Sequence, residues 1–127
     1  MTPESVVKKW ADKPFAYGAD CCQFAGEMVE ALHGFNPMNA FSYADEREAN
    51  RIIGEYGNLE AAITATLGNP HFEPAEGDVV VVDQTDGSQI AGVVFEGRIL
   101  VRARKGFIRW PRAYARRAWS CRKQYPL

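Results

Sequence analysis

The sequence is poor in the residues that hold metal ions and disulfides. Its 127 residues include only two histidines and three cysteines, and two of the cysteines are neighbours in the chain. Adjacent cysteines do not easily bond to each other, and three thiols make poor material for a disulfide framework. The sequence has no Cys-x-x-Cys pair, and its two isolated histidines complete no zinc pattern. We therefore expect no metal and no cofactor.

The sequence also lacks a long apolar run and a strong net charge. No stretch approaches the roughly 20 apolar residues of a membrane-spanning helix. The first residues, Met-Thr-Pro-Glu, lack the basic start and apolar stretch of a signal peptide. A net charge of -1 provides no overall field to hold nucleic acid or an anionic membrane. We expect synthesis in the cytoplasm, no membrane span and no nucleic-acid partner.

The positive charges are concentrated near the end of the chain. Ten cationic side chains lie between Arg98 and Lys123: Arg98, Arg102, Arg104, Lys105, Arg109, Arg112, Arg116, Arg117, Arg122 and Lys123. They fit the outward positions of surface strands, because charged side chains usually face solvent. They also fit a basic face that docks on an acidic partner. Nucleic-acid binding is a further alternative, but no interleaving of aromatic and basic residues forms a clear groove.

The N-terminal half has the patterns of helices. Thr2, Asp20 and Asn58 are good N-caps for three of them, and Tyr43–Tyr56 has the charge pattern of a more exposed fourth. The helix after Asp20 carries an apolar stripe at helical spacing that must be buried. Glycines end two of the predicted helices, at Gly34 and Gly68.

The C-terminal half has the patterns of strands. β-Branched and apolar runs predict strands over the following ranges: Val79–Val82, Ile90–Phe95, Arg98–Ala103, Phe107–Trp110 and Arg117–Cys121. Helices followed by an antiparallel meander are typical of an α+β fold, with N-terminal helices packed on a small C-terminal sheet. We expect one domain over residues 1–127, because two halves would each be too small to bury a core.

The stretch from Tyr17 to Ala25 points more strongly to a catalytic site than any other part of the sequence. It places Cys21 at the first position of a long amphipathic helix. Unpaired N–H groups and the positive end of the helix dipole favour a thiolate there and lower the pKa of the thiol. Cys21 is therefore a candidate nucleophile. The alternative is a structural thiol, since free cysteine is among the most buried residue types.

This stretch resembles the NlpC-type cell-wall peptidases of the papain-like group, in which Tyr-Gly leads into Asp-Cys at a helix start. A second matching segment is Gly77–Val82, followed by Ile90–Gly97. In those enzymes a strand led by Gly-Asp precedes a strand that opens with His-x-Gly. The resemblance implies a papain-like architecture for the whole chain.

Three short motifs resemble an uncharacterised phage tail-associated branch of that superfamily. They are Asp20-Cys21-Cys22, Leu59-Glu60-Ala61 and Arg116-Arg117-Ala118-Trp119. This resemblance implies a virion protein of the tail, made in the host cytoplasm. The implied partners are tail-tip hub or distal tail proteins, with peptidoglycan as a further possibility.

One position departs from the enzymes. Cys21 matches their nucleophile, but Ile90 stands where they have the general-base histidine, and isoleucine accepts no proton. His33 lies twelve residues beyond Cys21 on the same predicted helix, about 18 Å away at 1.5 Å per residue. His71, in the loop before the sheet, is the other candidate for a relocated base.

The sequence therefore favours a pseudoenzyme: a structural protein of a phage or prophage tail tip, or of tail assembly, on a degenerate peptidase scaffold. Without an oriented base, catalysis loses about 10²–10⁴-fold. The alternative is an active cysteine hydrolase that cuts peptidoglycan stem peptides or a tail precursor through Cys21. A Cys21 that reacts much faster than Cys121 with a small alkylating agent would favour the enzyme.

Overall fold

The computed structural model describes residues 2–12, 21–41, 43, 46–103 and 106–121. In these ranges the helices are α1 (Pro3–Ala11), α2 (Cys21–His33), η1 (Pro37–Ala40), α3 (Glu46–Tyr56), α4 (Leu59–Leu67) and η2 (Arg112–Tyr114). The strands are β1 (Val79–Asp83), β2 (Gln89–Phe95), β3 (Arg98–Arg102), β4 (Phe107–Trp110) and β5 (Arg117–Trp119). Four α-helices packed against a five-stranded antiparallel sheet confirm the predicted α+β fold.

Local sequence sets the helix ends that the structure describes. The Thr2 hydroxyl accepts a hydrogen bond from the Ser5 amide, and the Ser5 hydroxyl accepts one from the Thr2 amide, which forms a capping box. The Asn58 side chain caps α4 by accepting from the Ala61 amide. Gly68, at the end of α4, has a φ of 93° that favours glycine. These caps confirm the predicted boundaries, while the expected cap at Asp20 lies outside the described residues.

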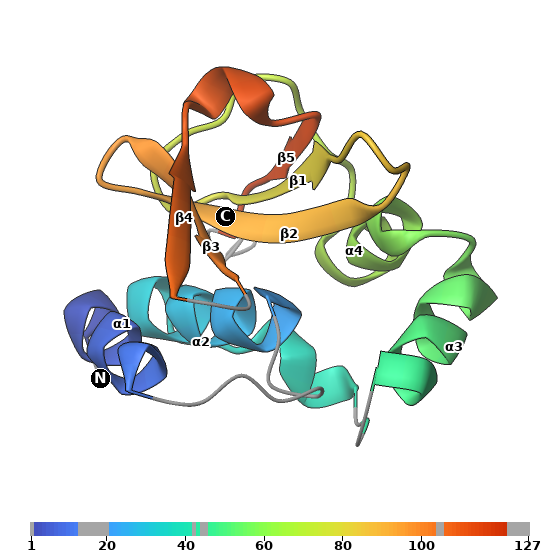
Figure 1. Ribbon diagram of the computed structural model, residues 1–127, viewed down its shortest axis with the longest axis horizontal. Coiled ribbons are helices and arrows are strands. Elements are labelled where there is room, and N and C mark those ends of the chain that lie inside the picture. The colour runs from blue at the N-terminus through green and yellow to red at the C-terminus, as the bar shows by residue number, and fades with distance from the viewer. Residues whose placement is uncertain (1, 13–20, 42, 44–45, 104–105, 122–127) are drawn as a thin grey trace, which may run out of the picture.

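The strand order β4-β3-β2-β1-β5 places β1 and β2 near the centre. Val79 pairs with Val93 of β2 and with Trp119 of β5, and all neighbouring strands are antiparallel. The edge strands β4 and β5 are joined by a short segment that contains η2. A flat sheet would separate its edges by about four strand spacings of 4.8 Å. Figure 1 shows that the sheet is strongly curled, and this curl brings the edge strands close enough for the short connection.

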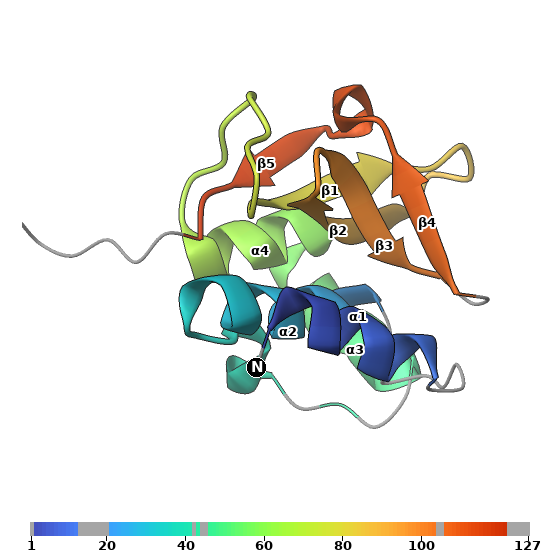
Figure 2. The same ribbon diagram turned by 90° about the vertical axis from the view of Figure 1, so that its left-hand side faces the viewer.

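The curled sheet is buried on both faces. One face packs on the helices, which Figure 2 shows gathered on one side of the sheet. The opposite face lies inside the curl and forms what we call the inner cluster: Val80, Val82, Val94, Ile99, Val101 and Ala118. Burial on both faces explains why the run Val79–Val82 is apolar throughout instead of alternating with polar residues.

Candidate functional site

Cys21 begins α2 at the junction between the helices and the inner cluster. Its side chain is half-buried and packs against the inner cluster as well as against the helix-facing core. The predicted position of this thiol at a helix start is therefore observed. Both clusters consist mainly of aliphatic side chains.

Ile90 is the second residue of β2 and pairs with Val82 of β1. It is half-buried and packs against the same inner cluster as Cys21. The structure thus brings the position expected for a general base to the cluster that holds the thiol. An aliphatic side chain occupies that position, so it extends the apolar packing and supplies no proton acceptor.

His33 lies at the far end of α2 from Cys21. Its Nε2 atom is 3.0 Å from the carbonyl oxygen of Gly77, just before β1. A Cβ atom at Gly77 would come within 2.9 Å of this ring nitrogen, and the φ of Gly77 is 87°, so the contact depends on glycine. His33 therefore ties the end of α2 to the start of the sheet.

His71 is held by a buried carboxylate at the edge of the sheet. Its Nε2 atom lies 2.9 Å from Asp78 Oδ2, and its Nδ1 atom accepts a hydrogen bond from the Glu73 amide at 3.3 Å. Because Nδ1 accepts, the neutral ring donates through Nε2 to Asp78. The His71 backbone also pairs with Ala118 of β5. Both ring nitrogens of His71 are thus engaged in fastening the loop before β1.

The structure does not bring His71 to the position of Ile90. Asp78 immediately precedes β1, whereas Ile90 pairs with Val82 toward the other end of the strand. Val82 lies four residues beyond Asp78, which is about 13 Å along a strand at 3.3 Å per residue. The His71–Asp78 pair and the Ile90 position therefore lie at opposite ends of β1.

Three aspartates at the ends of β1 and in the turn after it have structural partners. Asp78 Oδ2 also accepts from the Ala75 amide, which fits its predicted place at the lead of the strand. Asp83 pairs with Arg116 at 3.1 Å. The hydroxyl and amide of Ser88 both donate to Asp86 and lower the pKa of that carboxyl. Asp83 is the last residue of β1, and Asp86 lies in the turn that follows it.

Cys121 is a buried thiol at the end of the sheet. Its side chain is 2% exposed and packs in the helix-facing core. Burial raises the pKa of the Cys121 thiol to about 11; the negative charge of Asp78 contributes to this rise, and a hydrogen bond with the Val79 backbone opposes it. Because only the thiolate is a nucleophile, Cys121 is expected to be unreactive near neutral pH.

The Cys121 pKa predicts a loss of stability in alkaline solution. The folded state keeps the thiol proton up to about pH 11, whereas an unfolded thiol releases it near pH 9. The raised pKa of Cys121 therefore contributes to the free energy of unfolding. This contribution is fully present below pH 9, and up to about 3 kcal/mol of it is lost as the pH rises toward 11. Urea unfolding across this range measures the slope. In Cys121→Ala the extra slope should vanish, and an identical slope in both proteins would contradict the assignment.

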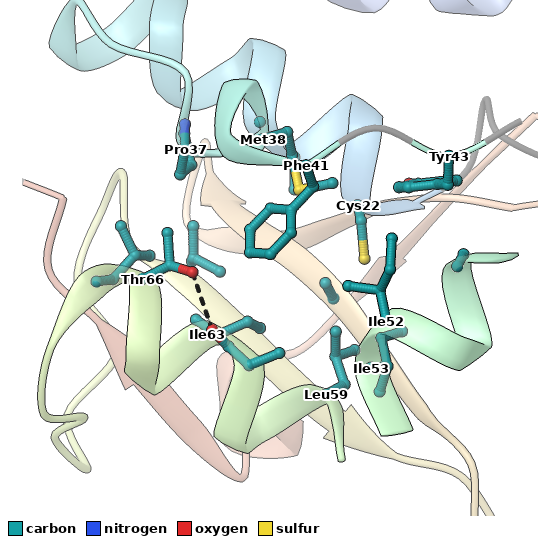
Figure 3. A pocket seen from close by; sticks show the side chains of 17 residues that line it. Cys22, Pro37, Met38, Phe41, Tyr43, Ile52, Ile53, Leu59, Ile63 and Thr66 are labelled. Carbon is teal, nitrogen blue, oxygen red and sulfur yellow. Dashed lines mark hydrogen bonds between the residues drawn. The ribbon is translucent and has the colours of Figure 1, made fainter. Parts of the chain in front are cut away.

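Cys22, the next residue along α2, lines a separate apolar cavity between the helices and the sheet. Figure 3 shows its side chain among those that line the cavity. Phe41 and Tyr43 line this cavity, whereas Phe24 and Trp119 are buried in the core. Phe15 and Tyr17 lie outside the described residues.

Among the described residues, no three His, Cys, Asp or Glu side chains gather where they could hold a metal ion. No helix in the same ranges has both the length and the apolar character needed to cross a membrane.

Comparison with known proteins identifies a family without assigning an activity. No curated protein and no solved structure matches the chain significantly. Residues 2–121 match DUF6950, described as a domain of unknown function. The match spans all the described elements, from α1 to β5. The chain therefore belongs to the DUF6950 family.

Proposed function

We propose that this protein is a structural component of a phage or prophage tail, at the tail tip or in its assembly. It uses an NlpC-type papain-like scaffold whose catalytic site has degenerated. The main support is the packing of Cys21 and Ile90 on the same inner cluster, with an aliphatic side chain in place of the base. The tail context rests on the resemblance of three short motifs: Asp20-Cys21-Cys22, Leu59-Glu60-Ala61 and Arg116-Arg117-Ala118-Trp119.

The loss of the base has a large chemical effect. A positioned general base contributes about 10²–10⁴-fold to catalysis, and the same group would later protonate the leaving amine. Neither role can be filled by Ile90, and both ring nitrogens of His71 already have partners. We therefore expect slow thiol chemistry to remain and efficient peptide hydrolysis to be lost.

The arrangement of the basic residues supports a protein partner for this scaffold. Arg116 and Arg117 are engaged by Glu60, and Arg102 is buried. By contrast, Arg109 and Arg112 are exposed on β4 and η2, and among the described residues no carboxylate pairs with either.

An exposed aromatic side chain lies in the same segment. Tyr114 is 57% exposed, and its ring centroid lies 6.4 Å from that of Trp110. Arginine and tyrosine are enriched at protein interfaces. We therefore assign Arg109, Arg112 and Tyr114 as the docking surface for an acidic tail protein.

Charge reversal at the docking surface tests the proposal in a phage that encodes this chain. Arg109→Glu with Arg112→Glu is expected to lower incorporation into virions at least tenfold, because both charges would then repel an acidic partner. Mass spectrometry of purified particles measures incorporation. Cys21→Ala is expected to leave particle yield and infectivity unchanged.

A matched control reverses two charges on α3. Arg47 and Arg51 are exposed, so Arg47→Glu with Arg51→Glu should leave incorporation unchanged. Absence of the wild-type chain from virions would refute a role in the mature particle. Equal incorporation of both double variants would refute the docking surface.

The alternative function is an active cysteine hydrolase acting on peptidoglycan stem peptides or on a tail precursor. It is favoured by one observation, the half-exposed thiol of Cys21 at the start of a 13-residue helix. This enzyme would need an imidazole lent by another subunit or partner. Loss of infectivity in Cys21→Ala, with the folded protein still incorporated, would support it.

A further inference from the structure

We propose that the cavity lined by Cys22 is a binding site for a compact, uncharged apolar group. The cavity lies between α2, η1, α3, α4 and the central strands, and it has a volume of about 90 Å³. It is partly open to solvent, so a group can enter without unfolding the helices. We call it the helical pocket.

The chemistry of the wall excludes a charged group from the interior of the helical pocket. Of the described residues that line the helical pocket, none carries a charge, and most are aliphatic or aromatic. The Thr66 hydroxyl on the wall already donates to the Ala62 carbonyl at 3.0 Å, as the dashed line in Figure 3 shows. A buried water molecule needs two to four polar partners, and this wall offers few. An apolar group therefore fits the helical pocket better than water does.

Small side chains keep the helical pocket open. Ala25 of α2, Ala49 of α3 and Ala62 of α4 are all buried and all line it. A larger side chain on any of the three helices would fill space that is now empty, and filling an apolar cavity usually stabilises a protein. The three alanines thus preserve a volume that packing alone does not require.

The volume sets the size of the ligand. An engineered apolar cavity of about 150 Å³, lined by similar side chains, binds benzene. The helical pocket is somewhat smaller but partly open, so it suits a group of the size of a benzene ring or a short branched alkyl group. Such a group is available as a free molecule or as the end of an acyl chain.

The six isoleucines of the chain allow a test with an internal control. Ile52, Ile53 and Ile63 line the helical pocket, whereas Ile90, Ile99 and Ile108 belong to the inner cluster or pack against it. When protein with labelled isoleucine methyl groups is titrated with benzene, the methyl signals of Ile52, Ile53 and Ile63 are expected to shift until binding is saturated. The signals of Ile90, Ile99 and Ile108 should shift at least fivefold less. Shifts of similar size in both groups, or shifts without saturation, would overturn the proposal.

Filling the helical pocket provides the second test. Ala49→Leu adds three carbon atoms to the wall and is expected to weaken benzene binding at least tenfold. Ala113→Leu makes the same change on the exposed surface of η2 and should leave binding unchanged. If Ala49→Leu does not fold, Ala62→Val fills the pocket from α4 instead. If folded Ala49→Leu or Ala62→Val protein bound benzene as tightly as the wild type, the proposal would be overturned.

Octanoate distinguishes the two sources of the apolar group. If octanoate reverses the benzene-induced shifts of these three isoleucine signals, the two compete for the helical pocket. This result would support the proposal with an acyl chain as the source. Saturable benzene binding without competition would support it with a compact free molecule. No saturable binding of either probe would overturn it.

Discussion

Replacing Ile90 with histidine is expected to accelerate alkylation of Cys21 about tenfold near neutral pH. Both side chains pack against the inner cluster, and Ile90 holds the position expected for the base, so we expect the new imidazole to lie near the thiol. An imidazolium partner stabilises the thiolate and raises its population strongly at this pH. The gain is limited to about tenfold because the nucleophilicity of a thiolate falls as its pKa falls. Mass spectrometry after timed iodoacetamide labelling resolves Cys21 from Cys22.

Ile108→His is the matched control for this gain. Ile108 also packs against the inner cluster, but it lies on the edge strand β4. Its replacement by histidine should leave the Cys21 rate within about twofold of wild type. A folded Ile90→His protein with an unchanged rate would show that Ile90 does not occupy the position of the missing base.

Trp119→Ala is expected to cause the largest loss of stability, about 3–5 kcal/mol. The Trp119 side chain is fully buried between the sheet and α4, in the same cluster as Leu59. Its Nε1 atom donates to the Thr64 hydroxyl at 3.3 Å, so the substitution removes this hydrogen bond and opens a cavity. Urea unfolding monitored by circular dichroism measures the change in the free energy of unfolding.

Trp110→Ala separates burial from the loss of an indole ring. Trp110 is only half-buried on the edge strand β4, so its replacement should cost less than half as much. Trp119→Phe keeps most of the apolar volume and should recover much of the loss. Equal costs for the two alanine variants would contradict the central position of Trp119 in the core.

The fold was largely predictable because its signals are local. The Thr2 and Asn58 caps and the apolar run Val79–Val82 depend on neighbouring residues, and the structure confirms each of them. The predicted end of the last strand was less accurate. β5 stops at Trp119, so the expected extension to Cys121 was wrong. Such boundaries depend on which residues the neighbouring strand can pair, which the sequence alone does not show.

The surroundings of the candidate site were less predictable because they depend on distant parts of the chain. Sequence motifs placed Cys21 at a helix start, but its packing on the inner cluster follows from the curl of the sheet. The His71–Asp78 pair also forms only when the loop folds back along β5. The engagement of Arg117 by Glu60 joins α4 to β5. No local pattern signals such contacts.

The helical pocket was missed for the same reason. Its wall combines side chains from four helices and two strands, so it exists only in the folded chain. The sequence feature that came closest to indicating the pocket was Ile52-Ile53, an apolar pair within the charged helix α3. This pair marks the face of α3 that turns inward, but it does not reveal that the space beyond remains unfilled.

The pH dependence of Cys21 alkylation in the wild-type protein tests the proposed absence of a catalytic base most directly. If no imidazole is coupled to this thiol, as we propose, the rate constant should rise with pH in a single step. Coupling to a histidine would divide the profile into two steps, as the thiolate–imidazolium pair forms and then loses its second proton. A single step is the predicted result. A two-step profile that is absent in His71→Ala, or that requires an added partner protein, would contradict the non-enzymatic assignment.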